Sequence, residues 1–264
     1  MATSTRALLS AIVVTAATLL LLAAPATANK DDHERVVQDD DSPERLDWKF
    51  ARTFNNRCAA HLNQSNYDLA LQDCNQTLRY DPKYAIAYNN RGFAHAGKGD
   101  LDRAIRDYDE AIRLDPHLTS ARYNRADVSE QGALYDRAFA DYDAIIRAHA
   151  ADARAWNNRC WTRAIVGQLE AALADCNEAL RLNPMSANAL DSRGFAYLKL
   201  GDLDRSAADY DAALQLNPRL ATSLYGRGLA KRIRGDRAGA DGDIAAAVAI
   251  KPNLAEEYAR YGVR

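Results

Sequence analysis

The chain has 264 residues, of which 48% are hydrophobic and 27% are charged. This composition predicts a folded chain, because a disordered segment would be less apolar. The formal net charge is −2, with 34 basic and 36 acidic residues interspersed along the chain. No basic field is present to recruit nucleic acid or an anionic membrane, so we expect neither as a partner.

The N-terminal segment predicts export. Arg6 precedes an uncharged apolar run at residues 7–24, and Ala26-Thr27-Ala28 supplies the small residues that a signal peptidase requires. Cleavage there removes a signal peptide of residues 1–28, leaves no transmembrane segment in the mature chain, and places the protein in the periplasm or outside the cell. The alternative is an uncleaved anchor, since about 18 apolar residues is the lower limit for spanning a bilayer.

Residues 29–50 are expected to form an acidic linker that ends in a lead-in helix. The segment includes the run Asp39-Asp40-Asp41 and is polar over most of its length, which is typical of a solvated linker. Ser42 followed by Pro43 is the pattern of an N-cap and a first-turn proline, so the helix is expected to begin there.

A period of 34 residues organises the rest of the chain. Residues 88–92, Tyr-Asn-Asn-Arg-Gly, recur two periods later at residues 156–160 as Trp-Asn-Asn-Arg-Cys. Self-similarity at this period predicts a solenoid of helix–turn–helix units. Counted from residue 51, the units span 51–84, 85–118, 119–152, 153–186, 187–220 and 221–254, and a C-terminal capping helix is expected within 255–264.

Each unit places small and large residues where packed helices require them. The eighth and twentieth places hold small residues, and the fourth and twenty-fourth places hold large ones in most units. Glycines are expected to end the first helices, and prolines to end the second helices. The third unit departs from this pattern, with Arg122 at the fourth place and Ala150 in place of the proline, so we expect it to be the least regular.

These residues resemble the tetratricopeptide-repeat family over residues 51–254. The resemblance implies an all-α superhelix of six units plus the cap, with a groove made by the first helices that binds a peptide or a partner protein. It therefore implies a scaffold or adaptor that is not an enzyme. The alternative is a small-ligand-binding or enzymatic protein that uses the pocket near Trp161. No catalytic motif occurs in the sequence, so no catalytic residue, cofactor or metal is predicted.

Two sets of residues in the groove are predicted to bind the peptide. An asparagine recurs at the sixth place of the first four units, and an amide both donates to and accepts from a peptide backbone. Aromatic residues at the ninth place supply apolar anchors. The set is Asn56, Asn90, Asn124, Asn158, Phe93, Trp161 and Phe195. The alternative is that the asparagines hydrogen-bond neighbouring helices and the aromatic rings pack on each other.

Every unit carries an arginine at its seventh place and an aspartate at its twenty-third. The matched occurrence predicts structural ion pairs, within a unit or with the unit before, because a planar guanidinium binds a carboxylate through two hydrogen bonds. The alternative is that the six arginines hold an anionic ligand. The residues are Arg57, Arg91, Arg125, Arg159, Arg193, Arg227, Asp73, Asp107, Asp141, Asp175, Asp209 and Asp243.

All four cysteines fall in two units with the same spacing, Cys58 with Cys74 and Cys160 with Cys176. Each pair stands at the eighth and twenty-fourth places, at the same height on facing antiparallel helices. An even cysteine count in an exported chain then predicts two disulfides. The alternative is four free thiols that act as small core residues.

His61 and His95 share the eleventh place of adjacent units, where the family usually has an aromatic residue. We expect them to pack in the core and not to bind a metal.

Protein recovered after export should begin at Asn29. Intact-mass measurement checks this directly, because a mature chain that still contains Met1 or the apolar run would show that the segment is an anchor.

Overall fold

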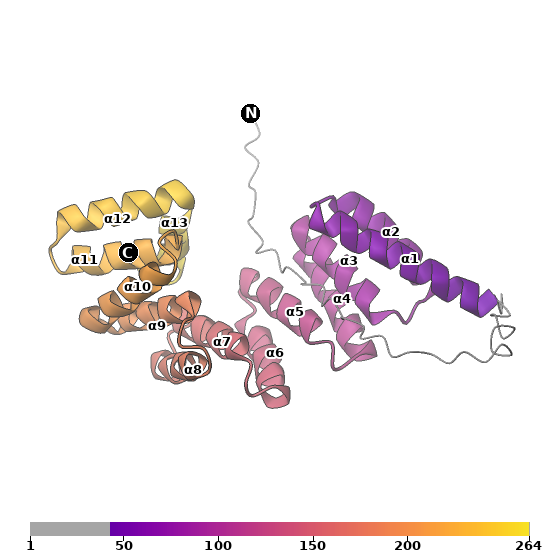
Figure 1. Cartoon of the computed structure of the whole chain (residues 1–264), viewed down its shortest axis with the longest axis horizontal. Helices are drawn as coiled ribbons and strands as arrows, with labels where there is room; N and C mark the ends of the chain where they lie inside the picture. The colour runs from indigo at the N-terminus through magenta and orange to yellow at the C-terminus, as the bar shows by residue number, and fades with distance from the viewer. Residues whose placement is uncertain (1–42, 264) are drawn as a thin grey trace, which may run out of the picture. The chain divides into compact units, whose positions relative to one another are not determined.

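The computed structural model describes residues 43–263, and the signal peptide and acidic linker predicted for residues 1–42 lie outside the described residues. The described residues form helices and no strand (Figure 1). The prediction of an all-α helical repeat fold is confirmed. The helices are α1 (Pro43–Asn63), α2 (Tyr67–Tyr80), α3 (Ala85–Gly97), α4 (Leu101–Leu114), α5 (Thr119–Gln131), α6 (Tyr135–Ala148), α7 (Ala153–Ile165), α8 (Leu169–Leu182), α9 (Ala187–Leu200), α10 (Leu203–Leu216), α11 (Ala221–Ile233), α12 (Arg237–Ile250) and α13 (Leu254–Arg260).

The chain divides into two compact units, with the division between Ala121 and Arg122 inside α5. In the first unit, α1 packs on α2 and α3, and α3 packs on α4. In the second unit, α7 packs on α6, α8 and α9, and α9 and α11 pack on each other and on α10. None of the helices at residues 43–263 is both long enough and apolar enough to cross a bilayer.

Helix α1 is longer than the other first helices because the lead-in segment and the first helix of the first repeat are one continuous helix. Pro43 is its first residue, in agreement with the sequence pattern. Residues 47–50 of the lead-in part are exposed, and the side chains of Trp48 and Phe50 are both about half exposed.

The turn inside every helix pair uses the same backbone conformation at the fifteenth place of the repeat. Four repeats have glycine there with φ between 78° and 91°, whereas Ser65 and Ala133 adopt φ values of 58° and 56°. The next residue donates its N–H back to the first helix; Asp100, for example, bonds the carbonyl oxygen of His95 at 3.0 Å. This left-handed conformation has a steric cost for a residue with a Cβ atom.

The third repeat concentrates several departures from the pattern. Ala133 takes the left-handed position, and Leu134 follows as an N-cap without a side-chain cap bond, where Asp100, Asp202 and Asp236 cap the equivalent helices of other repeats. Helix α6 nevertheless ends at Ala148 without the proline. The third repeat therefore keeps its helix pair although it lacks the glycine at the fifteenth place, the side-chain cap of α6 and the proline after α6.

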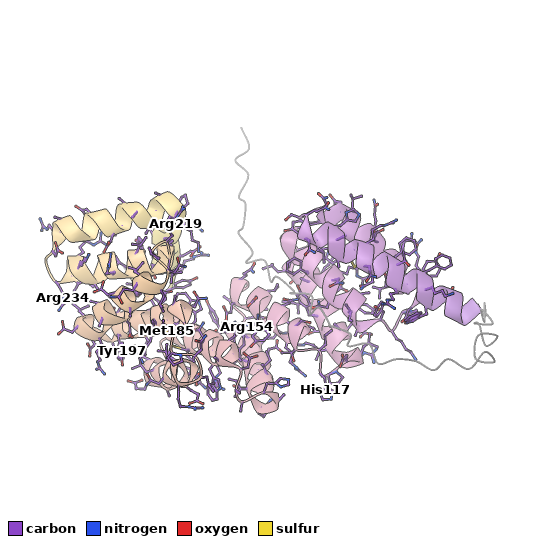
Figure 2. The ribbon with its side chains drawn as sticks, viewed as in Figure 1. His117, Arg154, Met185, Tyr197, Arg219 and Arg234 are labelled. Carbon is purple, nitrogen blue, oxygen red and sulfur yellow. A yellow bond between two sulfur atoms is a disulfide. The ribbon has the colours of Figure 1, made fainter. Side chains whose placement is uncertain are left out.

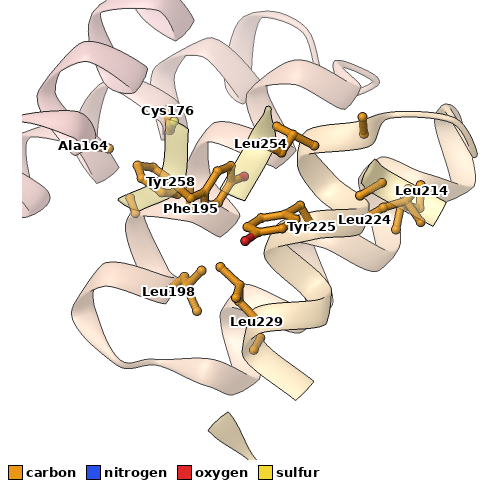
Figure 3. Packing of buried hydrophobic residues seen from close by; sticks show 14 of the residues in the cluster. Ala164, Cys176, Phe195, Leu198, Leu214, Leu224, Tyr225, Leu229, Leu254 and Tyr258 are labelled. Atoms are coloured by element: carbon orange, nitrogen blue, oxygen red, sulfur yellow. The ribbon is translucent and has the colours of Figure 1, made fainter. Parts of the chain in front are cut away.

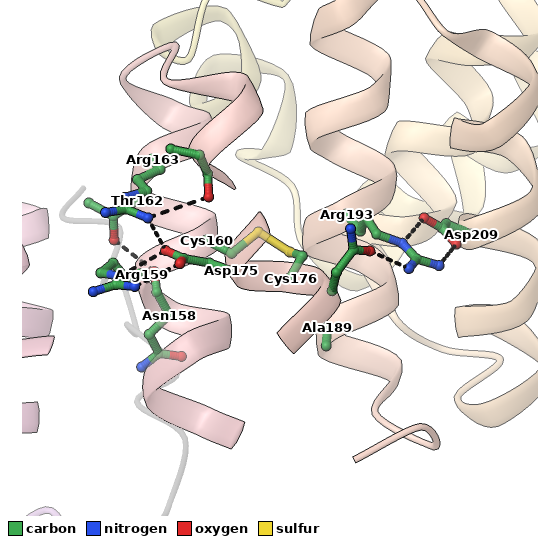
Figure 4. Close-up of a disulfide and its surroundings, with 12 residues drawn as sticks. Asn158, Arg159, Cys160, Thr162, Arg163, Asp175, Cys176, Ala189, Arg193 and Asp209 are labelled. Atoms are coloured by element: carbon green, nitrogen blue, oxygen red, sulfur yellow. Dashed lines mark hydrogen bonds and ion pairs between the residues drawn. A yellow bond between two sulfur atoms is a disulfide. The ribbon is translucent and has the colours of Figure 1, made fainter. Parts of the chain in front are cut away.

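The eighth and twenty-fourth places of a repeat face each other across the helix pair. A Cβ atom added to Gly92 would meet Tyr108 at 2.8 Å, and one added to Gly228 would meet Ile244 at 2.7 Å. In the first and fourth repeats this slot holds the cysteine pairs. Cys58 is bonded to Cys74 with a Cα–Cα distance of 5.5 Å. Cys160 is bonded to Cys176 with a Cα–Cα distance of 5.4 Å (Figure 4). A disulfide thus fills the space that a small and a large side chain fill elsewhere.

The arginine at the seventh place binds the aspartate at the twenty-third place of the same repeat in all six repeats. In the fourth repeat, Arg159 donates from Nε and Nη2 to Asp175 at 2.8 and 2.7 Å (Figure 4). Its Nη1 donates to Asp143 in the preceding repeat at 2.5 Å. The other five pairs are Arg57 with Asp73, Arg91 with Asp107, Arg125 with Asp141, Arg193 with Asp209 and Arg227 with Asp243.

The main apolar core of the second compact unit is built from residues of the helices from α7 to α13 (Figure 3). Tyr258 of α13 is 1% exposed, and its ring lies 5.3 Å from that of Phe195 and 4.8 Å from that of Tyr225. Its hydroxyl donates to the carbonyl oxygen of Thr222 at 3.0 Å. Helix α13 therefore packs against the first helices α9 and α11.

Replacing Ala133 with glycine should stabilise the protein by about 1 kcal/mol, because it relieves the left-handed strain at the turn. Gly99→Ala is the matched control. It should destabilise through the backbone alone, since an added Cβ at that position meets no atom within 4 Å. Chemical denaturation of the two variants checks this, and equal signs for the two substitutions would contradict it.

Asp107→Ala should lower the free energy of unfolding by about 3 kcal/mol, because it leaves the guanidinium of Arg91 without its carboxylate in a largely buried place. Glu110→Ala on the same helix removes an acid from the exposed pair with Arg113, and should have little effect because solvent screens that pair. Urea titration of both variants measures the free energy of unfolding. Similar losses of free energy in the two variants would show that the buried ion pair stabilises the protein no more than the exposed one.

Candidate functional site

A cavity of about 240 Å³ lies in the second compact unit, among α5, α6, α7, α9 and α11. We call it the inner cavity. Its lining combines carboxyl, amide, hydroxyl and aromatic groups and includes no lysine, arginine or histidine. The lining residues are Asp127, Glu130, Tyr142, Asn157, Asn158, Trp161, Asn188, Asp191, Ser192 and Thr222.

The repeat explains why these residues meet. All of them except Tyr142 stand at the second, fifth, sixth, ninth or twelfth place of a first helix, and residues three or four apart lie on one face of a helix. Successive first helices contact each other, as α7 does with α9 and α9 with α11. The same places are thus presented to the same side by neighbouring repeats.

Burial raises the pKa of all three carboxyl groups of the cavity, those of Asp127, Glu130 and Asp191. Glu130 receives hydrogen bonds from the hydroxyls of Tyr142, at 2.9 Å, and of Thr162. Asp191 is 6% exposed and receives one from Ser223 at 2.6 Å. Burial raises the pKa of Glu130 to about 7 and that of Asp191 to about 6, because the hydroxyl donors only partly replace the lost water.

The sequence analysis did not single out these carboxyl groups, because they belong to no catalytic or metal-binding motif. A signal was present nonetheless. Asp127 stands at the ninth place and Glu130 at the twelfth, where other repeats have mostly apolar residues, and Asp191 stands at a fifth place that is asparagine in three other repeats.

Trp161 and Asn158 are the two predicted peptide-binding residues that line the inner cavity. The indole ring of Trp161 is half-buried and lies 4.8 Å from the ring of Phe195 and 5.7 Å from that of Tyr261. The ring of Trp161 therefore packs against two other aromatic rings, and one of them belongs to Tyr261, which follows α13 in the chain.

Phe195 is not available as an anchor, which corrects the prediction from its ninth-place position. Its side chain is 0% exposed, because Tyr258 of α13 packs on it (Figure 3). Phe93 of the first compact unit is half-buried. The predicted row of accessible aromatic anchors is thus reduced in the second unit to Trp161.

The predicted asparagines differ in what they contact. Asn56 is exposed, whereas Asn90 donates from Nδ2 to Oδ1 of Asn55 on the neighbouring helix α1 at 3.0 Å. For Asn90 the packing alternative therefore describes the contact. Asn124 lies on α5 outside the cavity lining, and Asn158 lies within it.

The histidines at the eleventh place lie beside the structural aspartates. Nε2 of His61 is 3.5 Å from Asp73, and Nε2 of His95 is 3.9 Å from Asp107. Arg163 and Lys231 occupy the same place in other repeats and form ion pairs with their aspartates at 2.6 and 2.8 Å. The eleventh place is thus a second polar partner of the aspartate, which the expectation of core packing did not include. Across residues 43–263, no group of three or more histidine, cysteine or acidic side chains is arranged to hold a metal ion.

Glu130→Gln should stabilise the protein at pH 8 by an amount on the order of 1–3 kcal/mol, and by less at pH 5. The raised pKa means that the folded state holds a proton more strongly than the unfolded chain, whose glutamate titrates near pH 4.5. The stability that the protonated Glu130 contributes is therefore lost as the pH rises from about 4.5 to about 7. Asp127, Tyr142 and Tyr261 also interact electrostatically with this carboxyl group.

Melting temperatures of the wild type and the variant across this range are the measurement. Glu170→Gln, an exposed acid on α8, is the control. A constant difference between the wild type and the Glu130 variant at every pH would contradict the pKa of about 7.

Comparison with known proteins gives one match to each of two family models, both described as "Tetratricopeptide repeat", at residues 85–118 and 187–220. These are the second and fifth of the predicted repeats. A comparison with curated protein sequences gives no match.

Solved structures share the fold. A tetratricopeptide-repeat protein from Parabacteroides merdae has a TM-score of 0.67 at 18% identity, over 81% of this chain and 90% of its own. PilW, described as a type IV pilus biogenesis factor, has a TM-score of 0.67 at 17% identity, over 76% and 94%. YrrB, described as having an unusual peptide-binding site, has a TM-score of 0.50 at 22% identity, over 68% and 93%. The repeat matches, the paired helices and the shared fold identify this chain as a tetratricopeptide-repeat protein.

Proposed function

We propose that the protein is an exported interaction scaffold that binds an extended peptide segment of a partner protein at the inner cavity of its second compact unit. The observation that carries this proposal is the lining of that cavity. Amide groups of Asn157, Asn158 and Asn188 stand beside the ring of Trp161, so hydrogen-bonding groups for a backbone lie next to an apolar surface for a side chain.

Protein or peptide partners are the general expectation for this fold. The match to YrrB supports a peptide as the ligand, since that protein is described as having a peptide-binding site. The cavity suits a polypeptide better than a whole small molecule, because its volume of about 240 Å³ is below the range of roughly 300–1,000 Å³ typical of small-molecule sites. A small-ligand binder or an enzyme that uses the same cavity remains the second candidate.

Export is supported by the cysteines. Both cysteine pairs have the geometry of disulfides and no free cysteine is found among the described residues, which fits a compartment where disulfides persist. The periplasm or the outside of the cell is the proposed location, with residues 1–28 as the signal peptide.

Peptides selected from a random display library on the wild-type protein should lose most of their affinity for a Trp161→Ala, Asn158→Ala double variant. The expected loss is at least about tenfold, since an aromatic anchor of this kind contributes on the order of 2 kcal/mol. Met185→Ala is the control, because that side chain is 71% exposed in the turn before α9 (Figure 2).

Binding of the selected peptides is measured by fluorescence anisotropy, and the fold of each variant by circular dichroism. If the double variant folds and binds with unchanged affinity, the inner cavity is not the peptide site. A thermal-shift screen with metabolite mixtures tests the second candidate, because a shift abolished by Trp161→Ala would favour a small ligand.

A further inference from the structure

The inner cavity gathers carboxyl groups without a basic side chain among its lining residues. In every repeat, by contrast, the aspartate at the twenty-third place is bound by the arginine at the seventh place. In the cavity, Asp127, Glu130 and Asp191 come together from α5 and α9, and no basic side chain is among the lining residues.

The hydrogen-bond partners of Glu130 and Asp191 inside the chain are neutral hydroxyl groups. Glu130 is bonded by the hydroxyls of Tyr142 and Thr162, and Asp191 by that of Ser223. The guanidinium of Arg154 acts on the charge of Asp127 but lies over the ring of Tyr123, with its Cζ 3.4 Å from the ring centre. Hydroxyl donors satisfy hydrogen-bonding capacity without neutralising charge, so the cavity retains an electrostatic preference for a cation.

Two further features of the lining suit a cation with N–H donors. The side-chain oxygen Oδ1 of Asn157 is buried and has no hydrogen-bond partner within residues 43–263. An acceptor left in this state costs free energy unless a donor arrives. The indole of Trp161 lines the same cavity, and its ring face attracts an ammonium or guanidinium group.

We propose that the inner cavity binds the basic side chain, lysine or arginine, of the bound peptide. This inference rests on the proposed function, because it assigns the side chain that the peptide places in the cavity. A guanidinium offers five N–H donors and an ammonium three, against carboxylate acceptors on α5 and α9 and the amide oxygen of Asn157 on α7. The volume of about 240 Å³ fits one long side chain.

The test is isothermal titration calorimetry of the purified protein with the methylamides of Nα-acetyl-arginine, Nα-acetyl-lysine and Nα-acetyl-citrulline. Citrulline matches arginine in shape but carries no charge. We expect saturable binding of a basic amide, and binding about tenfold weaker for citrulline amide, since hydrogen bonds to charged groups are about twice as strong as neutral ones.

Glu130→Gln and Asp191→Asn keep the acceptor oxygens for Tyr142, Thr162 and Ser223 while removing a negative charge. Each should weaken the basic amide about tenfold. Glu170→Gln removes a charge on the exposed part of α8 and should leave the binding unchanged. No saturable binding at millimolar concentration, equal binding of citrulline amide, or binding unaffected by both cavity variants would overturn the proposal. Displacement of the signal by calcium chloride at equal concentration would also overturn it, since the cavity would then be a metal site.

Peptides from the display selection distinguish this proposal from the proposed function. If the selected peptides depend on Trp161 but are not enriched in lysine or arginine, and the basic amides do not bind, the assignment of the cavity fails while the peptide site stands. If the amides bind as expected but the selected peptides do not depend on Trp161, the cavity recognises a cation and the proposed function fails.

Discussion

The guanidinium at the seventh place of each repeat is the interaction on which the rest of the array depends. Arg159 binds Asp175 of its own second helix through Nε and Nη2, and Asp143 of the preceding second helix through Nη1. Arg227 does the same with Asp243 and Asp211. Because the guanidinium is planar and its donors point in fixed directions, one side chain sets the positions of three helices. In the fourth and sixth repeats these bonds tie a first helix to the second helices on both sides of it.

The disulfides belong to the same packing scheme and are not an addition to it. They occupy the eighth and twenty-fourth places, which elsewhere hold glycine or alanine against tyrosine or isoleucine. Each bond closes a loop with a sequence separation of 16, which corresponds to a stabilisation of about 3 kcal/mol in the chain-entropy model. One bond lies in each compact unit, so each unit has a covalent link between the two helices of one repeat.

Two kinds of buried acid therefore serve different ends in this chain. The aspartates at the twenty-third place are matched by arginines and hold helices together, whereas the carboxyl groups of the inner cavity are held by hydroxyls. The difference follows from position, because the first group faces the helix pair and the second faces the space that the first helices leave open. Burial raises the pKa of Glu130 and Asp191, which is the usual condition of an acid without a cationic partner.

The fold followed from the sequence to a large extent because its determinants are local and repeat every 34 residues. The helices, their turns and the all-α class depend on residues within one repeat, and an arginine and an aspartate sixteen residues apart must face each other across an antiparallel helix pair. The candidate site did not follow to the same extent. Asn158 and Trp161 line the cavity as their places in the repeat suggested, but Asp127, Glu130 and Asp191 gain their significance only from one another.

Only the tertiary structure decided which inner-face residues remain accessible. Phe195 and Trp161 stand at the same place of adjacent repeats, and nothing within either repeat distinguishes them. Phe195 is buried because Tyr258, some sixty residues further along the chain, packs on it, while Trp161 keeps a face toward the cavity. Burial and pKa depend on every group that surrounds a side chain, and those groups come from helices that a repeat pattern does not place.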